Sequence, residues 1–338
     1  MGKIVVFGAG TIGAYVGGSL LATGADVLLI GRARMRERIA GHGLHLTDLR
    51  GRQLRVAAGD VPYGEDPAAL AQAGLILLTV KSADTAAAAD AIAVHAPATA
   101  PVLSLQNGVG NLDLLRARLP GRTIIGGMVP FNVAQLEAGR LHRGTDGELM
   151  VEQSPALAPW RDAFRAAQLP LIERDDFQAV QWGKLLLNLN NPVNALSGLP
   201  LKTELSQRAY RRCLALLIDE ALATLGAAGI APAKIGRVAP RLLPALLRLP
   251  DAIFARLAAS MLKIDPEARS SMWDDLQAGR RTEIDYLNGA VVALARKLGR
   301  DAPVNRRMIE LMRAAEAGSG SLDGAALYRA LDAGSSGR

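Results

Sequence analysis

Three polar residues stand at helical spacing in an otherwise leucine-rich stretch of the second half of the chain. Lys184 and Asn188 are four residues apart, and Asn191 follows three residues later. On one continuous helix, these side chains would line one face over roughly 10 Å. A lysine and two amides are costly to bury among leucines without partners, so the pattern favours a functional site. The alternative is that Lys184 extends to water and the asparagines cap the helix end before Pro192.

A second group of candidate residues lies further along the chain. Thr282 and Asp285 are spaced as in a capping box, which predicts a helix with Glu283 in its first turn. A carboxylate near a helix amino terminus stays ionised readily. Ser270 and Ser271 lie upstream and offer hydroxyl donors suited to a carboxylate. Acids that only cap helices are common, so a structural role is the alternative for this group.

The amino terminus reads as a strand, a glycine-rich turn and a helix. Residues 3–7 form a short, mostly apolar run, and GAGTIG follows at 8–13. In a dinucleotide-binding fold, the three glycines permit a tight turn, close approach of a pyrophosphate, and packing of the helix on the strand. The pyrophosphate would lie at the amino end of the helix. The predicted cofactor-binding residues of this turn are Gly8, Ala9, Gly10, Thr11, Ile12 and Gly13.

The residues after the second predicted strand indicate which dinucleotide is bound. A site that prefers NAD carries an acidic residue there for the ribose hydroxyl. Here the strand at 26–30 is followed by Arg32 and Arg34. A guanidinium binds a 2′-phosphate, whereas a carboxylate would repel it, so we predict NADP(H) as the cofactor. A solvated basic loop is the alternative interpretation of these arginines.

Two further candidates follow buried strands of the first half. Lys81 comes after the apolar run at 75–80, and Asn107 comes after the run at 102–105. Ligands of open α/β sheets bind at the carboxyl ends of parallel strands. The sequence of the first half also predicts a small hairpin formed by residues 44–47 and 54–57. Further along, it predicts a short antiparallel segment over 129–151 and a strand at 169–172.

From residue 175 onward the strand signals vanish and the pattern becomes helical. We therefore predict an α/β fold class, with an N-terminal Rossmann-type dinucleotide-binding domain followed by an all-α C-terminal domain. The predicted parts are an NADP-binding domain at 1–173, a helical substrate and catalytic domain at 174–318, and a flexible tail at 319–338.

Length and composition predict a two-domain protein of the cytoplasm. The chain has 338 residues, of which 50% are hydrophobic, so it can bury a large core. No apolar stretch reaches the roughly 18 residues that span a membrane, and the start lacks the pattern of an export signal. Cys213 is the only cysteine and lies in an apolar run, which is typical of a core position and fits a reducing compartment.

The same composition argues against several classes of function. The four histidines form no cluster with metal-ligand spacing, so we predict no metal. The net charge of +7 favours anionic small molecules as partners. Aromatic residues make up only 4% and are not interleaved with basic residues, so nucleic acid is not predicted as a partner. The lack of an apolar stretch of spanning length argues against a membrane. The apolar helices of the second half could bury a homodimer contact.

Taken together, these motifs resemble those of the ketopantoate reductase family (2-dehydropantoate 2-reductases) over nearly the full length. The matching segments, in family order, are the glycine turn, TVK ending in Lys81, QNGVG with Asn107, WGKLLLN with Lys184 and Asn188, and SSM to TEIDYLN with Ser271 and Glu283. The resemblance implies reduction of 2-dehydropantoate to (R)-pantoate with NADPH, in pantothenate and coenzyme A biosynthesis. The alternatives are reduction of another 2-oxo acid, or an NADPH-binding sensor without turnover.

The resemblance also implies roles for the candidate residues. Lys184 would be the general acid that protonates the keto oxygen as hydride arrives from the nicotinamide, and Glu283 would bind the substrate hydroxyl. The implied binding roles are Ser271, Asn107 and Asn188 for the carboxylate and carbonyl of the substrate, Lys81 for a position beside the cofactor and the active site, and Arg32 for the 2′-phosphate.

The sequence departs from the family pattern in two places. The family spaces its second helix asparagine four residues after the first, but here Asn191 precedes Pro192 at a spacing of three, with Asn190 beside it. Either amide is therefore a candidate to face the substrate. The segment at 237–263 is also longer and more apolar than in compact family members, which bears on the identity of the 2-oxo acid.

Overall fold

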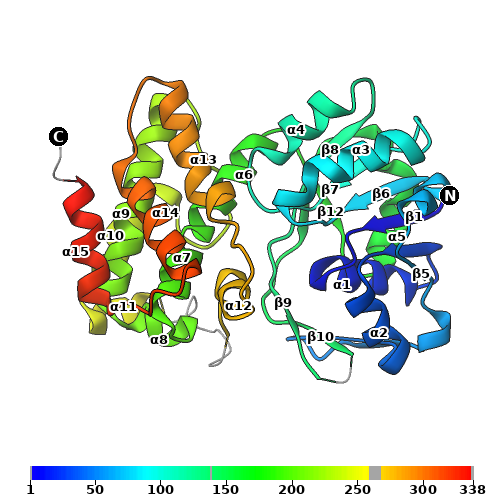
Figure 1. Cartoon of the computed structure of the whole chain (residues 1–338), viewed down its shortest axis with the longest axis horizontal. Coiled ribbons are helices and arrows are strands. Elements are labelled where there is room, and N and C mark those ends of the chain that lie inside the picture. Colours follow the sequence, from blue (N-terminus) through cyan, green and yellow to red (C-terminus); the bar gives the residue numbers. More distant parts are fainter. Residues whose placement is uncertain (1, 138, 259–267, 336–338) are drawn as a thin grey trace. The chain divides into compact units, whose positions relative to one another are not determined.

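The computed structural model describes the chain apart from residues 1, 138, 259–267 and 336–338. The chain divides into two compact units, Met1–Phe177 and Gln178–Arg338, which we call unit 1 and unit 2 (Figure 1). Unit 1 combines a sheet with helices, and the described part of unit 2 is helical. This confirms the predicted fold class, a Rossmann-type unit followed by an all-α unit.

Unit 1 is built on an eight-stranded sheet. In spatial order its strands are β12 (Leu171–Arg174), β11 (Leu149–Glu152), β8 (Ile124–Met128), β7 (Val102–Ser104), β6 (Leu75–Leu78), β1 (Ile4–Phe7), β2 (Val27–Ile30) and β5 (Tyr63–Gly64). Neighbouring strands are parallel except for β11 and β8. Strands β6 and β7 are buried throughout, as expected of central strands covered on both faces.

A second, four-stranded sheet lies in the same unit. Its order is β4 (Gln53–Val56), β3 (Leu44–Asp48), β10 (Arg140–Arg143) and β9 (Val133–Gln135). The antiparallel pairing of β3 with β4 confirms the predicted hairpin, and β10 pairs antiparallel with β9. Strand β10 also pairs in parallel with β3, and α1 (Thr11–Leu21) contacts β3, β4 and β9.

The remaining helices of unit 1 lie in the segments that link its strands. They are α2 (Ala33–His42), α3 (Thr85–His95), α4 (Asn111–Arg118) and α5 (Arg161–Ala166), with short 3₁₀ helices η1 (Ala58–Asp60), η2 (Pro67–Gln72), η3 (Ser82–Asp84) and η4 (Pro155–Trp160). Helices thus alternate with parallel strands along most of the unit, which is the arrangement that places binding turns at one edge of the sheet.

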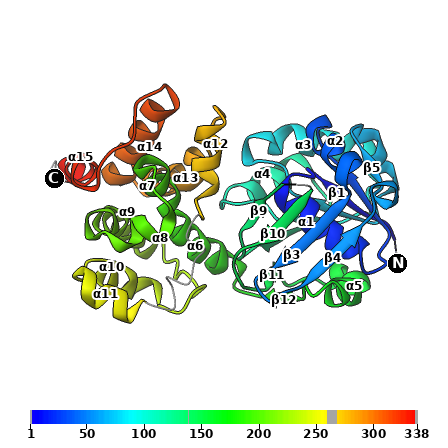
Figure 2. The same ribbon diagram turned by 90° about the horizontal axis from the view of Figure 1, so that it is seen from below.

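Unit 2 gathers its helices around α9 (Arg208–Ala227), the longest of those described (Figure 2). The others are α6 (Phe177–Asn188), α7 (Asn190–Ser197), α8 (Leu201–Ser206), η5 (Pro240–Leu242), α10 (Leu243–Leu247), α11 (Asp251–Leu257), α12 (Ser271–Gln277), α13 (Ile284–Lys297), α14 (Pro303–Glu316) and α15 (Gly324–Ser335). Helices η5, α10 and α11 occupy part of the segment at 237–263, whose last residues lie outside the described part. No helix in the described ranges is both long and apolar enough to span a membrane.

The predicted flexible tail at 319–338 is wrong for most of its length, because α15 forms there. Leu327 and Leu331 stand one helical turn apart and are fully buried, and α15 packs on α9 and α14. The Tyr210 hydroxyl also donates to the Leu322 carbonyl at 3.0 Å. The prediction of a tail gave weight to the glycines and serines that flank this helix and overlooked its two leucines. These two buried side chains are enough to hold one short helix against α9.

Candidate active site

The glycine turn between β1 and α1 has the geometry that its sequence predicts. Gly8 has a φ of +104°, and a Cβ there would lie 2.4 Å from the Val80 nitrogen. A Cβ on Gly13 would lie 2.5 Å from Oγ1 of Thr79. At Gly10, by contrast, the nearest atom to an added Cβ is 3.8 Å away. Close packing therefore requires glycine at positions 8 and 13, whereas the exposed Gly10 has room for a Cβ.

The amino end of α1 begins at this open position. Gly10 is its N-cap residue and offers no side-chain acceptor, so the first backbone N–H groups lack a side-chain cap. Thr11 and Ile12, the first two helical residues, are partly exposed, while Ala9 is buried and donates its N–H to the Ile30 carbonyl at 2.8 Å. Uncapped N–H groups beside a glycine without steric cover suit a phosphate or pyrophosphate.

Arg32 follows β2 and occupies the N-cap position of α2. Its guanidinium donates to the Asp84 carboxylate at 2.8 Å, although the two side chains are 83% and 47% exposed. Its backbone is held by Tyr63, whose hydroxyl donates to the Arg32 carbonyl at 3.0 Å. Burial raises the pKa of Tyr63 to about 12, so this hydroxyl keeps its proton. The backbone of Arg32 is fixed while its charged group lies in solvent.

Lys81 and Asn107 lie at the carboxyl ends of neighbouring parallel strands. Lys81 follows β6 and is the N-cap residue of η3, and Asn107 follows β7; both are exposed. Because β1 is the other neighbour of β6, the glycine turn shares this edge of the sheet. The structure thus brings the candidate residues of unit 1 to one edge, as the strand pattern predicts.

A buried polar network supports these turns and was not apparent in the sequence. Asn111 donates to the Asn107 carbonyl at 2.7 Å and to the Ser82 hydroxyl at 3.1 Å. Gln106 donates to the Val80 carbonyl at 3.0 Å and to the Thr85 hydroxyl at 2.8 Å. These bonds tie the turn after β6 to the turn after β7. Gln106 stands next to Asn107 in the polar turn, which is the one local signal that could have revealed it.

Lys184 lies in α6 at a position where the chain packs very closely. A Cβ on the preceding residue, Gly183, would lie 2.2 Å from the Ala233 carbonyl oxygen, and the Ala233 N–H donates to the Ala179 carbonyl at 2.8 Å. Lys184 itself is partly buried, and burial lowers its pKa to about 8. An amine with this pKa exchanges its proton close to neutral pH, which suits an acid catalyst.

The prediction of one continuous helix through Asn191 is wrong. Helix α6 ends at Asn188, Leu189 interrupts it, and α7 starts at Asn190. The break has a local cause, because Pro192 has no N–H to donate to the carbonyl of Asn188. Lys184 and the buried Asn188 remain one turn apart in α6, but Asn191 belongs to a different helix.

The structure distinguishes the two neighbouring amides. The Asn190 side chain is buried and donates to Oε2 of Glu204 at 3.0 Å, so it points into unit 2. Asn191 is partly exposed, and its carbonyl accepts from the Ser270 hydroxyl at 3.2 Å. Asn191 is therefore the amide of this pair with access to a ligand.

Ser271 and Glu283 both lie at helix starts. Ser270 caps α12 by accepting from the Trp273 N–H at 3.1 Å, and Ser271 is its exposed first residue. Glu283 is the N-cap residue of α13 and is partly exposed. Glu283 therefore lies just before the first turn of α13, whereas the sequence pattern predicted it within that turn.

The predicted capping box at Thr282 is wrong. Glu316 of α14 accepts from the Thr282 N–H at 2.8 Å and from its hydroxyl at 2.7 Å, while Asp285 pairs with Arg313. The acid that satisfies Thr282 therefore comes from a helix over thirty residues away in sequence, where no local spacing could reveal it.

Cys213 lies in the core, as the sequence predicts. It is fully buried, and its thiol donates to the Ala209 carbonyl at 3.3 Å. Burial raises the pKa of the thiol to about 12, so the thiolate that a nucleophile requires is scarce. No group of three or more His, Cys, Asp or Glu residues in the described part of the chain could hold a metal ion.

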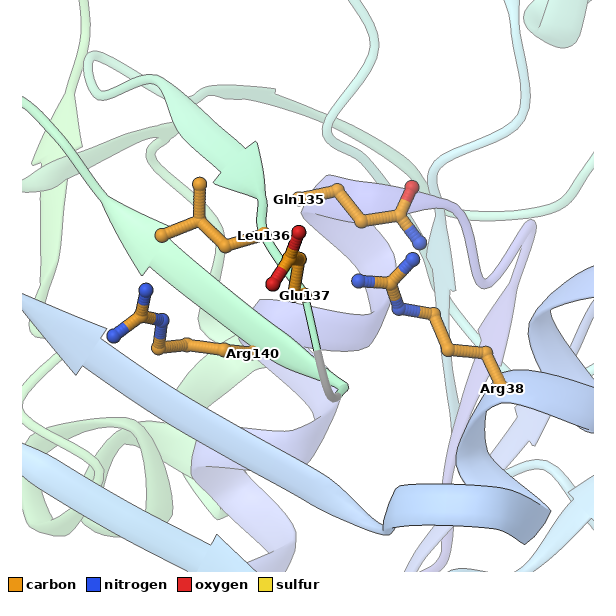
Figure 3. Close-up of a pocket in the computed structure, with 5 residues that line it drawn as sticks. All are labelled: Arg38, Gln135, Leu136, Glu137 and Arg140. Atoms are coloured by element: carbon orange, nitrogen blue, oxygen red, sulfur yellow. The ribbon is translucent and has the colours of Figure 1, made fainter.

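An open surface pocket of about 520 Å³ lies elsewhere in unit 1 (Figure 3). Figure 3 shows Arg38 of α2 extending toward the side-chain amide of Gln135 of β9. The residues that line the pocket are Arg38, Gln135, Leu136, Glu137 and Arg140. None of the candidate catalytic or binding residues is among them, so we assign the pocket no role in chemistry.

Comparison with known proteins agrees with these observations. Models of two parts of one family match the chain: ketopantoate reductase PanE/ApbA at residues 4–156, and its C-terminal part at residues 176–316. The 2-dehydropantoate 2-reductase of Pyrococcus horikoshii is 30% identical over 328 residues, which cover 94% of this chain and 99% of that protein.

Solved structures show the same likeness. A PanE/ApbA family ketopantoate reductase from Ralstonia eutropha superimposes with a TM-score of 0.78 at 31% identity, covering 93% of this chain and 98% of the other. A D-mandelate dehydrogenase bound to NADH and anilino(oxo)acetate shares the fold, with a TM-score of 0.73 at 22% identity over 93% and 98% of the two chains. From these matches over both units, we conclude that the chain belongs to the ketopantoate reductase family.

Proposed function

We propose that the protein reduces 2-dehydropantoate to (R)-pantoate with NADPH, a step toward pantothenate and coenzyme A. Membership of the family supports a reductase of this class. The single observation that carries the mechanism is the partly buried amine of Lys184, whose pKa is lowered to about 8. An NADPH sensor would need the glycine turn and a phosphate-binding arginine, but it would not need a proton donor.

The residues of unit 1 fit a nicotinamide dinucleotide. The exposed Gly10 and the uncapped start of α1 suit the pyrophosphate, and Arg32 offers a guanidinium to a 2′-phosphate. When bound, NADPH supplies the hydride that adds to the carbonyl carbon. The residues that we assign to cofactor binding are Gly8, Ala9, Gly10, Thr11, Ile12, Gly13, Arg32, Lys81 and Asn107.

Lys184 acts on the carbonyl oxygen of the substrate. As that oxygen gains negative charge, the ammonium stabilises it by a charge-assisted hydrogen bond. The Nζ–H bond then breaks and an O–H bond forms, which leaves a hydroxy acid and a neutral amine. One such donor is commonly worth about 3 kcal/mol of barrier. Because the pKa of Lys184 is about 8, the amine regains a proton from solvent near neutral pH.

Other side chains hold the substrate in place. Glu283 accepts a hydrogen bond from its hydroxyl group, and Ser271 donates to its carboxylate. Asn107 and Asn188 orient the carboxylate and the carbonyl, and the accessible amide of Asn191 adds a further donor. This set recognises a 2-oxo acid that bears a hydroxyl group, which is the chemistry of 2-dehydropantoate.

The proposal also includes a cytoplasmic location and a homodimer. Large apolar side chains of unit 2 are exposed at Leu242, Ile253 and Leu257, and they support a contact between copies of the chain. Sedimentation equilibrium measures this directly: a mass of one chain at micromolar concentration would remove the homodimer from the proposal.

The direct test follows NADPH consumption with 2-dehydropantoate beside a panel of other 2-oxo acids. We expect the highest kcat/KM with 2-dehydropantoate and a lower value for acids without the hydroxyl group. A higher kcat/KM for another acid would favour the alternative substrate. NADPH binding without oxidation by any acid of the panel would favour the sensor.

A further inference from the structure

Two buried carboxyl groups of unit 2 are bonded in different ways. Glu220 accepts from the Val304 N–H at 3.0 Å on Oε1, and from the N–H and the amide of Asn305 at 2.7 and 2.8 Å on Oε2. Both of its oxygens thus face N–H donors, as suits a carboxylate. Glu204 of α8 is completely buried, and its described donors all reach Oε2, from Asn190 at 3.0 Å and Asn194 at 3.3 Å.

Glu204 and Asn190 each have one acceptor atom without a hydrogen-bond partner among the described residues. These atoms, Oε1 of Glu204 and Oδ1 of Asn190, are both buried. Two acceptors cannot bond to each other, but a proton on Oε1 turns it into a donor for Oδ1. The Asn190 amide already donates to the other carboxyl oxygen, so one proton would complete a cyclic acid–amide pair.

The surroundings of Glu204 favour this neutral form. The titratable groups that face it from α9 are Tyr210 and Cys213, which carry no positive charge. Arg211 of α9 directs its guanidinium to backbone carbonyls, including that of Leu205, and to Asp251. From α7 the neighbours are the amides of Asn190 and Asn194. Burial raises the pKa of Glu204 to about 8, which agrees with a protonated carboxyl at neutral pH.

A buried chain of hydrogen bonds leads from Glu204 to the start of α12. Asn194 donates to Glu204, and its Oδ1 accepts from the Ser270 N–H at 2.9 Å. The Ser270 hydroxyl donates to the Asn191 carbonyl at 3.2 Å and accepts from the Trp273 N–H at 3.1 Å. Glu204, Asn194 and Ser270 are each at most 3% exposed, so water does not compete for these bonds.

We propose that Glu204 is a positioning residue, held as a neutral carboxylic acid paired with Asn190, which through Asn194 and Ser270 fixes Ser271 and Asn191 for binding the substrate carboxylate. Only the binding of the substrate carboxylate by Ser271 and Asn191 rests on the proposed function, because it requires that the protein act on a 2-oxo acid. The protonated pair itself is independent of any substrate.

The first experiment tests the protonated pair with Glu204→Gln and the matched control Glu220→Gln. A glutamine amide reproduces the O–H donor and the acceptor of a neutral acid, but at Glu220 it turns an N–H group toward N–H donors. We expect Glu204→Gln to melt within about 2 °C of wild type near pH 5 and Glu220→Gln to melt lower by about 4 °C or more. Equal losses in the two variants would overturn the neutral acid.

The pH dependence of melting provides a second readout of the pair. Because folding raises the pKa of Glu204 above its unfolded value, its contribution is complete at acid pH and is lost as the pH rises through about 8. We expect wild type to lose melting temperature relative to Glu204→Gln between about pH 5 and pH 9. A constant difference in melting temperature across this range would contradict the proposal. Wild type should also show an infrared band of a protonated carboxyl group that Glu204→Gln lacks, and the absence of this band from wild type would contradict the proposal as well.

The kinetic experiment tests the positioning role. We expect Glu204→Ala and Ser270→Ala to raise KM for 2-dehydropantoate by roughly ten-fold, which corresponds to about 1.4 kcal/mol, with KM for NADPH changed less than about two-fold. Glu204→Gln should restore the wild-type KM. Ser270→Ala decides the matter if Glu204→Ala does not fold. An unchanged KM for 2-dehydropantoate in Ser270→Ala overturns the positioning role, whereas an inactive wild type contradicts the proposed function and leaves the melting test intact.

Discussion

At the scale of single residues, burial acts on two ionisable groups of unit 2 in opposite directions. It lowers the pKa of Lys184 to about 8 and raises the pKa of Glu204 to about 8. In both cases the charged form is the one that loses hydration. For Lys184 the result is an amine that releases a proton readily, and for Glu204 it is an acid that stays neutral and offers a donor. One physical cause thus serves two roles in the proposed reaction.

Lys184→Met tests the proton donor. We expect kcat to fall by roughly 10² or more, with NADPH affinity nearly unchanged, because the amine acts on the carbonyl oxygen. In wild type, kcat should decline as the pH rises through about 8, where the ammonium is lost. Stopped-flow NADPH oxidation and a pH profile measure both.

The stability of Lys184→Met gives an internal control. Folding lowers the pKa of this amine, so its ionisation at neutral pH opposes folding, and the variant should melt no lower than wild type at about pH 7. A wild-type rate would remove Lys184 from the mechanism. A much lower melting temperature would mean that the rate loss reports misfolding.

Asp84 is expected to moderate the preference for NADPH. It pairs with Arg32 at 2.8 Å, but an exposed pair of this kind is worth only about 0–1 kcal/mol, so a phosphate can displace it. Asp84→Asn removes a competing and repelling carboxylate. We expect NADPH to bind roughly three-fold more tightly, with NADH affinity unchanged. Arg32→Asp should weaken NADPH far more than NADH.

The matched control for this pair lies on the same helix. Arg36 pairs with Glu65 at 2.8 Å and is also exposed, so Glu65→Gln removes an equivalent charge without freeing Arg32. Fluorescence titrations of both cofactors distinguish the two variants. If Glu65→Gln strengthened NADPH binding as much as Asp84→Asn, the effect would be general electrostatics and not release of Arg32.

At the scale of helices and strands, local sequence predicted the elements whose partners are close in the chain. The glycine turn and the β3–β4 hairpin rest on nearby residues, and both form as expected. The pairing of β10 with β3 and the bond from Thr282 to Glu316 join segments distant in sequence, so no local spacing shows them. Such long-range contacts override local preferences wherever they satisfy a buried polar group.

The site residues follow the same division. Lys184 and Asn188 share a face of α6 because their spacing is local, whereas the position of Asn191 depends on the break at Leu189. Pro192 indicated this break, but the prediction of one helix through Asn191 did not take it into account. The role of Glu204 could not be predicted, because the sequence around a single acidic residue in a short helix does not indicate that buried amides will bond to it.

Gly183→Ala tests how closely α6 must pack. Its added methyl group would meet the Ala233 carbonyl at 2.2 Å, so we expect a loss of about 1–3 kcal/mol in the free energy of unfolding. The kcat should also fall, because Lys184 is the next residue. Urea denaturation measures the first effect and steady-state kinetics the second.

Gly226→Ala in α9 is the matched control for this substitution. An added Cβ there has no atom within 4 Å, so alanine should stabilise the helix by about 0.5–1 kcal/mol. If both alanine variants were stabilising, the close contact of α6 with the Ala233 segment would be wrong.

At the scale of the whole molecule, each unit carries a core of its own, and the C-terminal helix completes that of unit 2. Removing residues 319–338 takes away Leu327 and Leu331, which are fully buried. Burial of a leucine is worth about 1.5–3 kcal/mol, so we expect the free energy of unfolding to fall by about 3 kcal/mol or more. NADPH affinity should change little, because its proposed ligands lie in unit 1. A melting temperature equal to that of wild type would show α15 to be dispensable.

The sealed position of Cys213 has a practical consequence for following the protein at work. Since this thiol is the only one in the sequence and is fully buried, maleimide dyes will leave native protein unmodified. Cysteines introduced at Val94 of unit 1 and Leu242 of unit 2, which are 75% and 55% exposed, would then carry a donor and an acceptor fluorophore. Energy transfer between the dyes would then measure, molecule by molecule, whether the distance between these two labelled positions responds to NADPH or substrate.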